Sequence, residues 1–315
     1  MSWKIKVIVI LLLLSSCIKE KKEDPTSALS DNFETSTSYL IEATELSDFI
    51  NKSGYKILDF RKREEYDIGH IEGALSIWRT DIEDNSYKYD GMMASPAQIE
   101  SLFSRLGIEI NDTLVIYDDN ALCDAARLWW ILQNYEFTKV RLVNGGLKSW
   151  TNIGGMITSE TPFYSESIFR FSSKPSMKYY VSKSEVLTAI GQKAIIIDTR
   201  SVDEYAGQTQ KKGAAKAGRI PGSTHIDWAD AVDLDGDSKF KSIDELNNVY
   251  KQLLDKKEDE IIVYCHSGVR SAHTVFVLTQ LLGFKNVKNY DGSWTEWSHF
   301  NELQFEKDSL TTINL

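Results

Sequence analysis

Ile261-Ile262-Val263-Tyr264-Cys265-His266-Ser267-Gly268-Val269-Arg270 is the stretch that decides the fold class of this chain. Its first four residues form a short apolar, β-branched run typical of a buried strand, and residues 271–282 have the pattern of a helix. A strand, a short loop and a helix in this order belong to a parallel α/β sheet, where ligands bind beyond the carboxyl ends of the strands. The loop 265–270 is therefore the first candidate functional site.

This loop combines a thiol with the features of an anion site. Gly268 permits a tight turn in which successive backbone N–H groups point inward, beside the amino end of the next helix. Such groups and nearby cations lower a thiol pKa from about 8.5 to roughly 3.5–7.5, so we predict that Cys265 is a thiolate nucleophile. His266 and Arg270 are expected to add positive charge, and Arg270 could grip an anion through two hydrogen bonds. The residues predicted to bind the anionic substrate are His266, Ser267, Gly268, Val269 and Arg270.

The pattern around this loop occurs twice in the chain. The matched segments of the first and second copies are 57–61 and 196–200, 69–74 and 218–223, and 114–117 and 261–264. Both copies keep the same order, and the second carries an insertion near residues 207–217. The chain is therefore predicted to be a tandem duplication of one domain.

Each copy alternates short strand patterns with helical patterns, which predicts an α/β domain with a parallel sheet flanked by helices on both faces. The segment between the copies is rich in Ser, Thr and Pro, as expected of a linker. The predicted boundaries are 39–155 for the N-terminal domain, 156–176 for the linker, 177–305 for the C-terminal domain and 306–315 for a tail.

The N-terminus has the regions of a secretory signal. Lys4 and Lys6 precede the apolar run 7–14, which is shorter than the roughly 20 residues that span a membrane. Leu14-Ser15-Ser16-Cys17 resembles a bacterial lipobox, which predicts a signal peptide over 1–16 and a lipid on Cys17. The charged segment that follows predicts a flexible tether over 17–38. We therefore expect a membrane-anchored lipoprotein of the cell envelope, facing the periplasm or the exterior; ordinary secretion is the alternative.

Charge and composition limit the partners. The 36 basic and 46 acidic residues give a net charge of −10, which argues against nucleic acid as a partner. Asp233, Asp235 and Asp237 resemble the start of a calcium loop, but Ser238 stands where the glycine of that loop belongs. The sequence therefore predicts no metal site, and we expect a monomer.

Taken together, these motifs resemble the two-domain rhodanese family of sulfurtransferases over about residues 39–305. The resemblance rests on the tandem pattern, the Cys-x-x-Gly-x-Arg loop, the Asp-x-Arg segments, Gly-Arg-Ile-Pro-Gly and the stretch 290–297. It implies a ping-pong reaction in which Cys265 takes the outer sulfur of thiosulfate, sulfite leaves, and the persulfide passes its sulfur to cyanide or a thiol. It also implies that no cofactor is needed.

The resemblance assigns roles outside the loop as well. It places Arg200 near the active-site loop, where it could contribute to substrate electrostatics, although a structural ion pair with Asp198 is equally compatible with the sequence. Asp118 stands opposite Cys265 in the first copy, which predicts a catalytically silent N-terminal domain. Cys123 of that copy is predicted to be inert. Packing or interface roles are predicted for Arg127, Trp129 and Trp130, and contact of one of them with substrate is the alternative.

Three alternative functions follow from the same residues. Family members that prefer 3-mercaptopyruvate carry an arginine where this chain has Glu204, which favours thiosulfate here. The second alternative is a phosphatase or arsenate reductase. Such an enzyme needs five residues between its Cys and Arg, whereas four intervene here, which argues against it. The third alternative is a non-enzymatic module that binds sulfane sulfur on Cys265. Lys211, Lys212 and Lys216 could form a positive rim or simply a solvated face.

Overall fold

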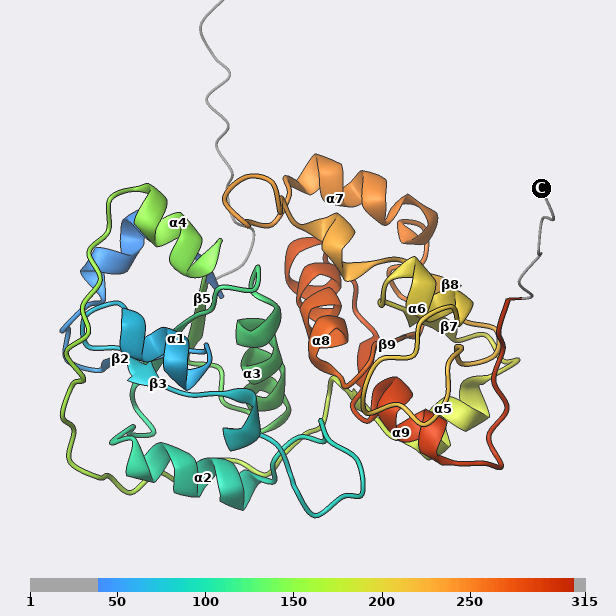
Figure 1. Ribbon diagram of the computed structural model, residues 1–315, viewed down its shortest axis with the longest axis horizontal. Helices are drawn as coiled ribbons and strands as arrows, with labels where there is room; N and C mark the ends of the chain where they lie inside the picture. The colour runs from blue at the N-terminus through green and yellow to red at the C-terminus, as the bar shows by residue number, and fades with distance from the viewer. Residues whose placement is uncertain (1–38, 309–315) are drawn as a thin grey trace, which may run out of the picture. The chain divides into compact units, whose positions relative to one another are not determined.

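The computed structural model describes residues 39–308, which belong to one compact unit (Figure 1). The predictions for the signal peptide, for Cys17 and for the tether lie outside the described residues and stay predictions. Within residues 39–308, no helix has both the length and the apolar character needed to cross a membrane.

Two parallel five-stranded sheets form the two halves of the protein, with the same topology in each. The spatial order is β1-β5-β4-β2-β3 in the first sheet and β6-β10-β9-β7-β8 in the second. The strands of the first sheet are β1 (Leu40–Ile41), β2 (Tyr55–Asp59), β3 (Leu75–Ser76), β4 (Thr113–Tyr117) and β5 (Val140–Val143). Those of the second are β6 (Tyr180–Val181), β7 (Ile195–Asp198), β8 (Thr224–His225), β9 (Ile261–Tyr264) and β10 (Val287–Tyr290). The predicted fold of two tandem α/β domains is thereby confirmed.

Helices flank both sheets. The first half contains α1 (Arg63–Ile68), α2 (Pro96–Arg105), α3 (Cys123–Asn134) and α4 (Gly146–Asn152). The second half contains α5 (Lys183–Ala189), α6 (Val202–Ala206), α7 (Ile243–Val249), α8 (Val269–Phe276) and α9 (Ser293–His299). Short 3-10 turns cover Ala43–Asp48, Arg79–Asp81, Trp228–Ala231 and Lys251–Leu253, and a π turn, Val277–Leu281, continues α8.

The sequence duplication produces the same hydrogen bonds in both halves. The Tyr117 hydroxyl, at the end of β4, accepts the N–H of Ile71 at 3.0 Å. The Tyr264 hydroxyl, at the end of β9, accepts the N–H of Ile220 at 3.1 Å. The residues that follow these two tyrosines therefore occupy equivalent positions.

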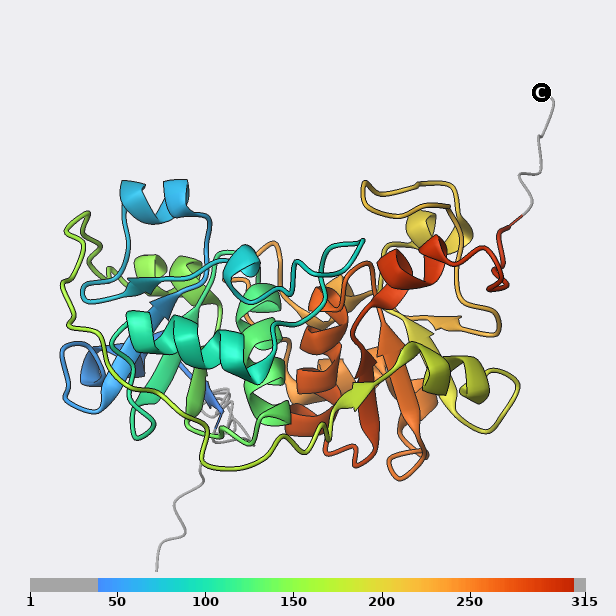
Figure 2. The same cartoon turned by 90° about the horizontal axis from the view of Figure 1, so that it is seen from below.

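Helices α3 and α8 pack against each other and lie between the two sheets (Figure 2). Trp129 is fully buried, with its ring edge-on to Phe276 at 4.9 Å and stacked with Tyr179 at 5.7 Å between centroids. The indole N–H of Trp130 donates to the Tyr179 carbonyl at 2.9 Å. The two tryptophans are thus interface residues, one of the roles that their sequence context indicated.

Candidate active site

Cys265 directly follows the central strand β9, at the carboxyl edge of its sheet. Gly268 turns the chain into α8 with a φ of +76°, and a Cβ there would lie 2.6 Å from the Asp291 carbonyl oxygen. This position therefore requires glycine. The helix begins at Val269, two residues earlier than predicted, so that Val269 and Arg270 lie in its first turn.

Ser293, the first residue of α9, organises the backbone of this loop. Its hydroxyl oxygen accepts the N–H groups of Cys265 and Gly268, both at 3.1 Å, and its proton goes to the Tyr290 carbonyl at 2.7 Å. Two of the loop's N–H groups are therefore held by a side chain rather than left for a ligand. The sequence reasoning missed this role, although Asp291-Gly292-Ser293 follows β10, the neighbour of β9 in the sheet.

The Cys265 thiol is 1% exposed and lies among groups that stabilise its thiolate. Burial alone would raise its pKa, because a thiolate loses its solvation in the interior. The Arg270 charge, the Ser271 hydroxyl and the N–H groups of Ser271 and Ser267 outweigh burial, and the thiol pKa falls below its ordinary value. Among the described residues, the buried Ser271 hydroxyl has no nitrogen or oxygen partner, which leaves it for the sulfur.

Arg270 is held by Glu204 of α6. Its Nη1 and Nη2 donate to the two carboxylate oxygens at 2.7 and 3.0 Å. Burial would raise the pKa of Glu204, but the hydrogen bonds and charge of Arg270 lower it to about 2. The prediction that Arg270 grips a substrate anion through two hydrogen bonds is therefore corrected, because both of its Nη groups donate to Glu204. Arg270 acts on the sulfur through its charge.

His266 does not add the positive charge that the sequence suggested. Burial lowers its pKa to about 4, with help from the charges of Lys211 and Arg270. Its Nε2 lies 3.0 Å from the carbonyl oxygen of Lys212, which places the proton on Nε2 of a neutral ring at pH 7. The positive charge of the loop itself therefore comes from Arg270.

Arg200 is fully buried and braces the end of β7. Its Nε donates to Asp198 at 2.9 Å, and its Nη2 donates to the Gly218 carbonyl at 2.7 Å. Arg61 makes the equivalent contacts with Asp59 and a glycine carbonyl in the first half, where no cysteine follows. The structural ion pair that the sequence left open is thus the arrangement observed, and the contribution of Arg200 to substrate electrostatics stays a prediction.

Two segments of the chain match one family model. The model for the rhodanese-like domain covers residues 42–153 and 182–300. The chain belongs to the rhodanese family. The Cys265 loop lies within the second match, and each match covers four of the five strands of one sheet.

Relatives of this rhodanese carry sulfur-transfer names. Sulfur carrier protein TtuD of Thermus thermophilus is 38% identical over 246 residues, 74% of this chain and 84% of that protein. Thiosulfate sulfurtransferase of Corynebacterium glutamicum is 32% identical over 288 residues, 88% of this chain and 93% of that protein. The crystal structure of YnjE has the same fold, with a TM-score of 0.74 and 23% identity over 86% of this chain and 68% of that one. The chain is therefore a tandem rhodanese with sulfurtransferase function.

In this rhodanese the first-half loop surrounds a carboxyl group of its own. The Asp118 carboxylate is fully buried and accepts four backbone N–H groups at 2.9–3.1 Å. The donors are Asn120, Leu122, Asp124 and Ala125. Burial, then the charge of Asp124, raises the pKa of Asp118 to about 7. A side-chain carboxyl group thus fills the anion nest that surrounds the thiol in the second half.

The rhodanese's first half also reaches the Cys265 loop through an arm, residues 83–93, whose ends pair with each other. A Cβ at Gly91 would lie 2.5 Å from the Ser267 Cβ, so the arm backbone contacts the loop directly. The Tyr89 hydroxyl donates to Glu296 of α9 at 2.9 Å. No sequence pattern pointed to this arm, which contacts the loop at Ser267, two residues after Cys265.

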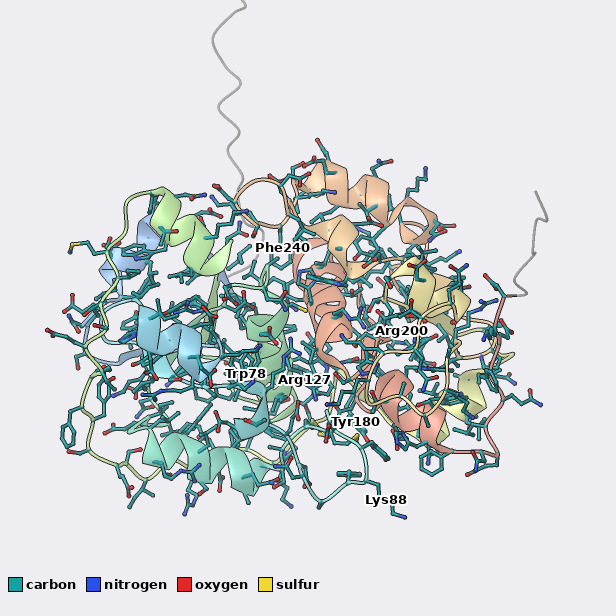
Figure 3. All side chains as sticks on the ribbon, viewed as in Figure 1. Trp78, Lys88, Arg127, Tyr180, Arg200 and Phe240 are labelled. Carbon is teal, nitrogen blue, oxygen red and sulfur yellow. The ribbon has the colours of Figure 1, made fainter. Side chains whose placement is uncertain are left out.

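Arg127 ties the arm to the loop of this rhodanese. It is 2% exposed and donates to the Gly91 carbonyl at 2.8 Å and to Asp291 at 2.6 Å. A longer bond of 3.3 Å reaches the carbonyl of Gly268. Figure 3 shows Arg127 between the two halves and Lys88 at the outer end of the arm. A first-half residue therefore fixes the backbone at the glycine of the Cys265 loop.

A buried histidine of this rhodanese makes its stability depend on pH. His273 of α8 is fully buried beside the rings of Trp228 and Phe240, and burial lowers its pKa to about 3. The unfolded imidazole titrates near pH 6.5, so the unfolded state binds more protons between pH 3 and 6.5. The free energy of unfolding therefore falls as the pH falls through this window.

We expect His273→Leu to remove this dependence. The linkage amounts to about 2 kcal/mol between pH 7 and pH 5 for one such histidine. Urea unfolding at both pH values should show that the variant loses about 2 kcal/mol less than the wild type. Equal losses in the two proteins would contradict a neutral, buried His273.

Proposed function

We propose that this rhodanese transfers the outer sulfur of thiosulfate to a thiol or cyanide acceptor through a persulfide on Cys265. The observation that carries the proposal is the environment of the thiol, whose pKa is lowered by Arg270 and by N–H groups of Ser267 and Ser271. A thiolate in this position is a nucleophile near neutral pH. The same donors suit the negative charge of a terminal persulfide sulfur, as preorganised N–H groups suit an oxyanion.

The reaction has two half-reactions. The Cys265 thiolate attacks the outer sulfur of thiosulfate, the bond from that sulfur to the sulfonate sulfur breaks, and its electron pair leaves with sulfite. The acceptor thiolate or cyanide then attacks the terminal sulfur, the new S–S bond breaks, and Cys265 regains its thiolate. Electrons balance in each step, so the cycle uses no external oxidant or reductant.

Glu204 supports thiosulfate rather than 3-mercaptopyruvate as the donor. The family resemblance of the sequence implies that members preferring 3-mercaptopyruvate carry an arginine at this position. Here Glu204 is a carboxylate itself and neutralises Arg270. The relative named thiosulfate sulfurtransferase adds support for this choice of donor.

Mass spectrometry of the protein treated with thiosulfate tests the proposal. We expect the peptide that contains Cys265 to gain the mass of one sulfur atom, and to lose it when cyanide is added. The peptide with Cys123 should keep its mass, because burial raises the pKa of that thiol well above its ordinary value. A Cys265 peptide without added sulfur would contradict the persulfide.

The name of one relative favours a second candidate. The 38% identical protein of Thermus thermophilus is named a sulfur carrier protein, which suggests a persulfide that is passed to a protein rather than to a small acceptor. Both candidates need the Cys265 persulfide. Rapid thiocyanate formation from thiosulfate and cyanide would favour the enzyme, whereas a stable persulfide without turnover would favour the carrier.

A further inference from the structure

The arginines around the two equivalent loops already face carboxylates. The pairs are Arg79 with Asp124, Arg127 with Asp291, Arg200 with Asp198, and Arg270 with Glu204. His266 is neutral, as its low pKa shows. Thiosulfate is a dianion. Because each arginine of this group already has a carboxylate partner, none of them offers an unpaired positive charge to the sulfonate end.

Lys211 differs from these arginines. Within residues 39–308, its ammonium group has neither an ion pair nor a hydrogen bond. The residue lies in the second-half insertion, residues 207–217, which the first half lacks. Lys211 is exposed, so a ligand can reach it from solvent.

The insertion lies against the catalytic loop. The carbonyl oxygen of Lys212 is 3.0 Å from Nε2 of His266, and a Cβ at Gly213 would lie 3.4 Å from the same nitrogen. These two contacts fix the backbone on the carboxyl side of Lys211. The neutral form of His266 suits this position. With its proton on Nε2 the ring donates a hydrogen bond to the Lys212 carbonyl and adds no charge to the site.

The charges near Lys211 are those of the active site. Although the residue as a whole is exposed, neighbouring protein atoms partly desolvate its ammonium; this desolvation, then Arg270, lowers the pKa of Lys211, while Glu204 and the Cys265 thiolate oppose the shift. Lys211 in turn lowers the pKa of His266. The ammonium therefore lies within electrostatic reach of the thiol, and an anion bound there would compensate its charge.

The other two lysines of the predicted rim do not share this position. The Lys216 ammonium donates to the Phe300 carbonyl at 3.0 Å and lies over the Phe305 ring at 5.0 Å. Lys212 is exposed and meets the loop through its carbonyl, not through its side chain. Lys211 is thus the lysine of the predicted rim whose ammonium interacts with the charged groups of the active site.

We propose that Lys211 is a specificity-determining residue that binds the sulfonate end of thiosulfate while the outer sulfur faces Cys265. The inference rests on the proposed function and names the residue that selects a dianionic donor. An ammonium group is a compact charge with three donors, which suits a sulfonate whose oxygens point in several directions. The same contact holds the charge that collects on sulfite as it leaves.

Kinetics with two donors test the role of Lys211. Thiosulfate carries two negative charges, whereas methanethiosulfonate carries one and releases methanesulfinate from the same attack on its outer sulfur. We expect Lys211→Gln to raise the KM for thiosulfate about tenfold, as for the loss of one charged hydrogen bond at a partly exposed site. The KM for methanethiosulfonate should rise at most about threefold.

The matched control is Lys193→Gln, which removes the same charge from an exposed position before β7, at the opposite end of the strands. This variant should keep the wild-type KM for both donors. An unchanged KM for thiosulfate in Lys211→Gln, or the same rise in Lys193→Gln, would overturn the assignment.

A binding measurement separates this inference from the proposed function. Calorimetric titration of Cys265→Ser with thiosulfate needs no turnover, and adding Lys211→Gln should weaken the binding about tenfold. Equal binding by the two proteins would overturn the role of Lys211. A wild-type protein that forms no persulfide would instead contradict the proposed function, whatever the titration shows.

Discussion

Cys265→Ser is expected to lower thiosulfate:cyanide sulfurtransferase activity at least about a thousandfold, because it removes the nucleophile itself. A serine hydroxyl ionises far above neutral pH and its oxygen cannot form a persulfide. The replacement is small and polar, and the N–H groups of Ser267 and Ser271 remain available to it. Thiocyanate formation at saturating thiosulfate and cyanide measures the effect.

Cys123→Ser is the matched control for this experiment. Cys123 begins α3 in the first half, is 1% exposed, and has its pKa raised by burial and by Asp124. A thiol of this kind stays protonated and unreactive. The variant should keep activity within about twofold of the wild type. A loss equal to that of Cys265→Ser would contradict the assignment of Cys265 as the nucleophile and Cys123 as an inert thiol.

The fold and the place of Cys265 could be predicted because both depend on local patterns. The run Ile261–Tyr264 is a buried strand wherever it lies in the sheet, and a residue directly after it must emerge at the carboxyl edge. Because the pattern is duplicated, Tyr117 and Asp118 have the equivalent places in the first half. One residue identity, Asp118, shows that the first half has no cysteine opposite Cys265, and the catalytic silence of that half stays a prediction.

The charge of the site could not be predicted, because burial and distant partners decide it. His266 counts as a cation by composition, yet burial keeps it neutral. Arg270 and Glu204 are 66 residues apart in the chain, and nothing in either segment shows that they meet. The arm and Arg127 likewise contact the loop from the other half of the protein.

The ion pair between Arg270 and Glu204 is expected to contribute strongly to the stability of the fold. Arg270→Gln leaves the Glu204 carboxylate, whose side chain is 9% exposed, without its counter-ion. Breaking a buried pair from one side costs about 3–5 kcal/mol, because the remaining charge stays desolvated. Urea unfolding at pH 7 should show a loss of this order in the free energy of unfolding.

The double variant Arg270→Gln/Glu204→Gln separates stability from catalysis. Two amides can bond to each other, so most of the lost stability should return, whereas the charge beside Cys265 stays absent. Alkylation of Cys265 by iodoacetamide, followed against pH, should have its midpoint at higher pH in both variants than in the wild type. A midpoint that returned with stability would show that Arg270 acts on the thiol only by holding the fold.

The pH dependence of stability gives the same pair an independent test. The pKa of Glu204 is about 2 in the folded protein and near 4.5 when unfolded, so its stabilisation is complete above pH 4.5 and disappears as the pH falls toward 2. This linkage amounts to about 3 kcal/mol at neutral pH. The double variant has no carboxylate to titrate at this position and should lose correspondingly less stability in acid. Identical acid profiles for the double variant and the wild type would mean that the pair does not hold Glu204 ionised.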